Sequence, residues 1–361
     1  MSFRKIFIKS LSALLIASSL SVPVFANTTT TEIKNETDVK EEKRVLTLKE
    51  AVKSAINCST NLKLLEKQTD TNRYILDHSR SDDYSDHDLS YTIQDDEKNK
   101  AFYKDKLEYL TGVYYDQLII TNENLALLDK QIASLEKDVD VLKLQLSHGY
   151  TDELTLKSKE SELEQLKNSK ITSEANLTKL KEDFRIITNL DSTKYTLENN
   201  ITYEPFKASI NINGYINTRI DEMQKYSSEY ADYFASTLSA RITLPNSNQI
   251  SESNYANAVL KKQQLYSNMA IEHDNYMQTL LGQYTQLIDK EKTIDNTKEK
   301  IAMLDKNIAA TKVKLDKGLA TAIEYDKLLL QKEELENSLL NTIYQHNDIK
   351  KVLDKPWVSL M

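Results

Sequence analysis

A coiled-coil repeat of apolar residues, carried twice by the chain, most limits what this sequence can fold into. Seven apolar residues alternate at spacings of three and four: Leu125, Leu128, Ile132, Leu135, Val139, Leu142 and Leu146. A 3.5-residue period is typical of two helices that pack along a narrow stripe. Between Val24 and Glu204 there is no proline, and glycine occurs only at Gly112 and Gly149, which favours long helices.

The same apolar pattern returns 169 residues later. Its second copy consists of Ile294, Thr297, Ile301, Leu304, Ile308, Thr311 and Leu315. Upstream of the pattern, Tyr115, Leu118 and Ile119 match Tyr284, Leu287 and Ile288 without a gap. Self-similarity at a fixed offset is the mark of an internal duplication.

Two glycines predict where each copy turns. Gly149 and Gly318 follow the two ascending patterns, and glycine closes a helix C-terminus at little steric cost. Apolar return patterns follow each turn, namely Leu156, Leu163, Leu166, Leu177, Leu180 and Phe184, then Leu328, Leu335, Leu339 and Ile343. We therefore predict an all-α fold of two tandem, long antiparallel coiled-coil hairpins, with the first ascending helix spanning 101–148.

The ends of the chain indicate export. Residues 1–26 combine Arg4, Lys5 and Lys9 with a short apolar run and small residues before a cut after Ala26, the pattern of a signal peptide. Residues 27–44 form a polar linker. We assign 45–200 to the first repeat, with its tip at Gly149, and 201–361 to the second, with its tip at Gly318.

Composition excludes several classes of function. The formal net charge of −8 argues against nucleic acid as a partner. The sequence contains no catalytic triad order, phosphate loop or paired cysteines, so we expect neither an enzyme nor a cofactor. Six acidic and histidine residues crowd 78–88, but their spacing fits no defined metal loop, so we predict no metal site there: His78, Asp82, Asp83, Asp86, His87 and Asp88.

Several segments resemble the TolC-like outer-membrane efflux proteins. The opening LTLKEAVKSAINCSTNLKLLEKQ (46–68) is similar to the family's first helix, although Asn57 is followed by Cys58 and not by proline. The tips around Gly149 and Gly318 resemble the family's glycine-centred tips, and KEDFRIITNL (181–190) resembles the end of its first repeat. The resemblance covers essentially the whole chain after the signal peptide.

The resemblance implies a homotrimer with a hollow helical tunnel, closed by a β-barrel in the outer membrane. Where the family has two barrel strands per repeat, this chain offers one short alternating stretch in each, at 89–93 and 238–245. We therefore expect the barrel region to be reduced to short strands or loops.

The resemblance also places candidate sites at the tips. The residues expected to dock a pump adaptor are Gly149, Tyr150, Thr151, Gly318, Leu319 and Ala320. Glu324 is a candidate tunnel-mouth acid, for which an ordinary exposed helix carboxylate is the alternative. The implied partners are further copies of this chain and an envelope adaptor of an ABC or other exporter.

These observations lead to one functional prediction and two alternatives. We predict the exit duct of an efflux or type I secretion assembly, exported to the cell envelope, outer membrane or cell surface. The first alternative is a barrel-less envelope coiled-coil scaffold with no transport activity. The second is a secreted rod of the adhesin kind.

Overall fold

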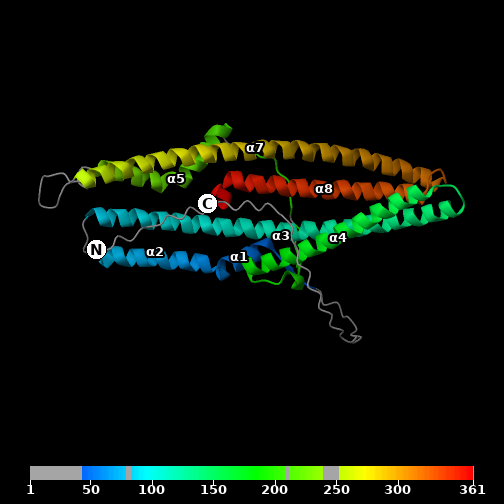
Figure 1. The fold of residues 1–361 in the computed structure, drawn as a ribbon, viewed down its shortest axis with the longest axis horizontal. Coiled ribbons are helices and arrows are strands. Elements are labelled where there is room, and N and C mark those ends of the chain that lie inside the picture. The colour runs from blue at the N-terminus through cyan, green and yellow to red at the C-terminus, as the bar shows by residue number, and fades with distance from the viewer. Residues whose placement is uncertain (1–42, 79–82, 200, 209–210, 239–251, 361) are drawn as a thin grey trace, which may run out of the picture.

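The computed structural model describes residues 43–78, 83–199, 201–208, 211–238 and 252–360. These residues form an elongated, almost entirely helical molecule in which two hairpins lie side by side (Figure 1). The two turns lie at the same end of the molecule. The two-hairpin fold predicted from the apolar repeat is therefore confirmed.

The first repeat consists of one long helix with three shorter helices along it (Figure 1). Helix α3 carries α4 along the half nearest the tip, and α1 and α2 along the other half. The 65 residues of α3 span about 100 Å at 1.5 Å per residue. The bounds are α1 Leu48–Cys58, α2 Thr60–His78, α3 Asp83–Ser147 and α4 Glu153–Thr188.

The second repeat follows the same plan. Helix α7 carries α8 along its tip half and α5 along the other half, and the short α9 follows α8 (Figure 1). One continuous α5 replaces the separate α1 and α2, which are divided at Ser59 by extended backbone. The bounds are α5 Ile212–Ser236, α7 Glu252–Asp316, α8 Ala322–Asp354 and α9 Trp357–Leu360.

The duplication is visible in the helix ends. Helix α7 begins and ends 169 residues after α3, and α8 begins 169 residues after α4. The predicted start of the first ascending helix at Ala101 was wrong, because α3 already begins at Asp83.

The short strand predicted at 89–93 was also wrong. The alternating residues there lie within α3, where Tyr91 packs its ring against Tyr230 and Tyr233 of α5. Aromatic packing against a neighbouring helix favours the helical conformation over the strand that alternation suggested. The second predicted strand, 238–245, lies outside the described residues after Leu238.

Each repeat has its own buried core, built largely at equivalent positions. Ala51, Leu118 and Phe184 in the first core correspond to Ile220, Leu287 and Leu353 in the second. The second core also takes Phe102 from α3, whose ring stacks on Trp357 at 4.3 Å between centroids. The second core therefore joins the two repeats.

A small sheet and a connector cross the middle of the molecule. Strands β1 (Arg44–Leu46) and β2 (Tyr195–Leu197) pair in parallel, directly after the 3-10 turn η1 (Ser192–Lys194). The hydroxyl of Tyr115 donates to the Leu46 carbonyl at 2.5 Å. These are the only strands in the described part of the chain, where no helix is long and apolar enough to span a membrane.

Candidate functional site

Both predicted tips are tight helix-ending turns with a left-handed glycine. Gly149 has φ +73° and Gly318 has φ +70°. At the first tip the Tyr150 amide donates to the Gln145 carbonyl at 2.8 Å, and the equivalent bond recurs at the second tip. No atom would crowd a Cβ at either glycine, so the backbone conformation alone favours glycine there.

The returning helices begin at matched caps. Asp152 caps α4 by accepting a hydrogen bond from the Thr155 amide at 2.7 Å, and this bond lowers the pKa of the Asp152 carboxyl. Thr321, the equivalent residue, caps α8 in a capping box with Glu324. These caps satisfy amide groups that a helix N-terminus would otherwise leave without partners.

The capping box gives Glu324 a local role. Its carboxylate accepts a hydrogen bond from the Thr321 amide at 2.9 Å. Glu324 lies on an exposed helix end, where the alternative role of an ordinary exposed helix carboxylate places it. Its role as a tunnel-mouth acid stays a prediction.

Each tip presents two large apolar side chains to solvent. Tyr150 is 81% exposed and Leu319 is 74% exposed, while Thr151 and Ala320 beside them are half-buried. Leu154 and Ile323, one helical turn farther on, are also exposed and were missed by the sequence analysis. Their identical offset from the two glycines was a signal that could have found them.

A groove between the two hairpins opens behind the tips. It lies between α3 and α8 and encloses about 510 Å³. Its apolar lining includes Ala133 of α3 and Ile323, Leu329 and Leu330 of α8. The exposed side chain of Ile323 therefore belongs both to the second tip and to this groove.

Polar pairs hold α3 and α8 together along the groove. Three bonds cross the seam: Lys130 to Glu333 at 2.8 Å, Gln131 to Glu334 at 2.7 Å, and Lys327 to Asp138 at 2.8 Å. Exposed pairs of this kind contribute about 0–1 kcal/mol each. Their main effect is to fix the register of one repeat against the other.

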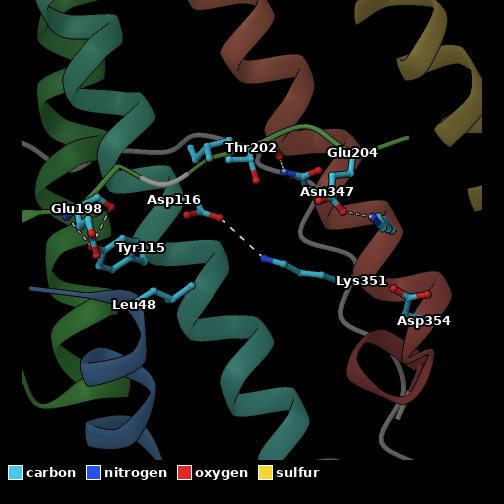
Figure 2. Close-up of a pocket in the computed structure, with 11 residues that line it drawn as sticks. Leu48, Tyr115, Asp116, Glu198, Thr202, Glu204, Asn347, Lys351 and Asp354 are labelled. Atoms are coloured by element: carbon cyan, nitrogen blue, oxygen red, sulfur yellow. Dashed lines mark hydrogen bonds and ion pairs between the residues drawn. The ribbon is translucent and has the colours of Figure 1, made fainter. Parts of the chain in front are cut away.

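A cavity of about 330 Å³ lies at the middle of the same seam. Figure 2 shows Asp116 of α3 and Lys351 of α8 reaching toward each other across it, with 3.9 Å between their charged atoms. The connector residues Thr202 and Glu204 lie along one edge, close to Asn347. The Asn347 amide donates to the Thr202 carbonyl at 2.7 Å.

Burial changes the acidity of this seam. It raises the pKa of the Asp116 carboxyl to about 6, although the nearby Lys351 opposes the change. The pKa of Asp348 is also raised by burial, and the Tyr109 hydroxyl that donates to it at 3.1 Å limits the rise. The sequence analysis did not identify these two carboxyl groups, because their burial depends on how one hairpin packs against the other.

The acidic and histidine residues between 78 and 88 have other contacts. The ring of His78 stacks on Tyr74 at 4.1 Å, and the ring of His87 lies 5.2 Å from Tyr233. No group of three or more metal-binding side chains occurs among the described residues. Asp82 and the Asp83 side chain lie outside the described part of the chain.

The sequence matches no protein-family model and no curated protein. The fold, in contrast, is similar to several solved structures at low sequence identity. The Campylobacter jejuni CmeC outer-membrane channel has a TM-score of 0.60 and 12% identity, over 95% of this chain and 94% of that one.

Two further channels are similar over nearly their whole length. The transmembrane channel protein CusC has a TM-score of 0.63 and 9% identity, over 95% of this chain and 99% of that one. The Neisseria gonorrhoeae MtrE outer-membrane channel has a TM-score of 0.56 and 10% identity, over 94% and 97%. The chain therefore has the fold of these outer-membrane channels, which is the TolC-like fold that the sequence predicted.

Proposed function

We propose that this protein is the exit duct of an efflux or type I secretion assembly. In this proposal several copies, three by analogy with the TolC-like proteins, form a helical tunnel in the cell envelope. Residues 1–26 direct export and are removed, and residues 45–200 and 201–361 are the two repeats. The tips dock the adaptor of an inner-membrane pump.

The observation that carries the proposal is the pair of matched tips. Two glycine turns at one end of the molecule present four exposed apolar side chains at equivalent positions: Tyr150, Leu154, Leu319 and Ile323. A structural turn needs the glycine but not the exposed apolar groups. Aromatic and apolar side chains of this kind become dominant contacts when a partner covers them.

The test is the double variant Tyr150→Ser with Leu319→Ser in the native host. Both side chains are exposed, so folding and oligomer size should match the wild type. Recovery of the adaptor after in-cell cross-linking should fall at least tenfold, and tolerance of exported compounds should fall with it.

A matched control uses the exposed Ile186→Ser, on α4 but far from the tip. This variant should retain both the adaptor and export. If the tip double variant exports normally and holds its partners as tightly as the wild type, the tips are turns only. The scaffold without transport would then be the better account.

A further inference from the structure

The duplication leaves each repeat with one covered side and one open side. Within the chain, α3 of the first repeat packs against α8 and α5 of the second. The counterparts of these helices, 169 residues away, are α7 for α3, α4 for α8 and α2 for α5. Extensive contact between α7 and either α4 or α2 is absent from the described residues. In Figure 1, α7 and the α4 and α2 pair lie on opposite edges of the molecule.

We propose that α7 of one copy packs on α4 and α2 of the next copy, in the way that α3 packs on α8 and α5 within one chain. The occupant of the open side is thus a second copy of this chain. The inference rests on the proposed oligomeric tunnel and specifies its interface. Because the two faces differ, the contact is heterologous and is expected to close into a ring.

The first support is where exposed apolar side chains gather. Of nineteen large apolar side chains left exposed, twelve lie on the three helices that this contact would cover. Only four lie on α3 and α8. The twelve are Leu64, Tyr74 and Ile75 on α2, Leu154, Ile171 and Ile186 on α4, and Tyr255, Leu260, Tyr266, Ile271, Met303 and Val313 on α7.

The second support is the identity of the counterpart positions at the end opposite the tips. Tyr91 and Tyr233 pack across the α3 and α5 seam with 5.4 Å between ring centroids. Their counterparts are Leu260, 53% exposed, and Leu64, 63% exposed. An apolar contact inside the chain therefore corresponds to two exposed apolar side chains on the faces that the proposal pairs.

The same correspondence holds in the tip half. Ile323 and Leu340 of α8 line the grooves of the α3 and α8 seam. Their counterparts on α4, Leu154 and Ile171, are 78% and 63% exposed. Ser134 of α3 lines the groove as well, and its counterpart Met303 is 66% exposed.

The charges, however, differ between the two seams. The counterparts of the Lys130 and Glu333 pair are Glu299 and Glu164, which bear the same charge. The other two cross-seam bonds correspond to Lys300 with Gln165 and to Asn307 with Ser158, neither of which is an ion pair. The contact between copies is therefore weaker near the tips than the contact within a chain, and it is the seam that separates first there.

Chemical cross-linking tests this geometry. In a Cys58→Ser background, Asn307→Cys with Ser158→Cys should react with a short bismaleimide to give covalent oligomers. The template pair Asp138→Cys with Lys327→Cys should react within one chain and leave the mass of a monomer, because these positions face each other at 2.8 Å between their polar atoms.

Two controls sharpen the result. Asn307→Cys with Ile171→Cys moves one position 13 residues along α4, about 20 Å, and should cross-link poorly. Differently tagged chains that carry only Asn307→Cys or only Ser158→Cys should cross-link when mixed. Each should remain uncross-linked alone, since a heterologous contact does not bring a residue opposite itself.

A charge cycle tests the weak point. Glu299→Lys or Glu164→Lys alone should restore attraction and tighten self-association about two- to fivefold in sedimentation equilibrium. The double substitution should return the affinity to near wild type. A steady change with total charge would contradict the predicted pairing.

The outcomes separate the two proposals. A sample that sediments as an oligomer but gives no Asn307–Ser158 product, while the template pair reacts, overturns this interface and leaves the duct standing. A well-folded monomer at every concentration overturns both the tunnel and the interface.

Discussion

The cores of the two repeats occupy equivalent positions but differ in chemistry at one of them. Leu177 packs among apolar side chains in the first core, and its counterpart in the second repeat is His346, which is fully buried. The Nε2 atom of His346 lies 3.2 Å from the Glu291 carboxylate. The first repeat has Asn122 in place of that glutamate, so the polar pair arose as a unit in one copy only.

The difference is connected to what each repeat must hold. Glu291 also accepts a hydrogen bond from the Phe206 amide at 2.7 Å, and the ring of Tyr203 lies 5.0 Å from that of His346. These contacts bind the connector between the repeats to the second hairpin. A duplicated scaffold therefore keeps its helix register while a single core position is adapted to hold a segment that the first repeat does not carry.

The largest effect should come from truncating the shared core position. Phe184 and its counterpart Leu353 are almost fully buried. Phe184→Ala should cost about 3–5 kcal/mol and Leu353→Ala about 2–5 kcal/mol, measured by urea unfolding. Hydrogen exchange should show lost protection mainly in the repeat that carries the change. Equal loss in both repeats would contradict separate cores.

Exchanging the residues at the differing position should give the next largest effect. Leu177→His places a polar ring in an apolar core without a carboxylate and should cost about 2–3 kcal/mol. His346→Leu leaves Glu291 without its imidazole partner and should cost about 1–3 kcal/mol. Adding Glu291→Asn to His346→Leu should recover part of that loss in the same unfolding measurement. No recovery would show that the two residues are not coupled.

The third effect depends on pH and belongs to the first repeat, because the counterpart of Asp116 is the uncharged Thr285. Folding raises the pKa of Asp116 to about 6, so the folded state binds more protons than the unfolded state between about pH 4 and 6. Stability from this group is present below pH 4 and is lost as the pH rises to 6.

Asp116→Asn should therefore gain up to about 2 kcal/mol over the wild type between pH 4 and pH 7. Urea midpoints across this range measure the difference, and the buried Asp348 adds a change of the same sign to both proteins. A constant difference between variant and wild type would contradict the raised pKa.

The smallest effect concerns the glycines. Gly149→Ala and Gly318→Ala should each cost about 1 kcal/mol, because both have positive φ. Gly282→Ala is the matched control, since this glycine lies inside α7 with open space at its Cβ. It should stabilise by about 0.5–1 kcal/mol in the same thermal or urea unfolding assay. Equal effects at all three glycines would show that the tips need no left-handed residue.

Much of this architecture could be predicted from the sequence. The period of Leu125 through Leu146, its recurrence after 169 residues and the two glycines determined the hairpins and their turns. These are local signals with simple physical causes. The strand predicted at 89–93 failed because its alternation did not report that Tyr91 packs against another helix.

The missing parts were those that depend on contacts between distant segments. The raised pKa of Asp116 arises where α3 meets α8, and the buried pair of His346 with Glu291 joins two helices and the connector. Neither has a spacing in the sequence that marks it. Only the exposed Leu154 and Ile323 had such a mark, in their shared offset from the tip glycines.

Electron microscopy of the purified protein tests the central claim most directly, namely that the duplicated hairpins assemble side by side into a tunnel. End-on class averages should show a closed ring around a hollow centre, with the hairpins of the two repeats alternating around it. Side views should show cylinders of about 100 Å, the length of α3 and α7. Single rods of that length at every concentration, with full helical content, would contradict the account.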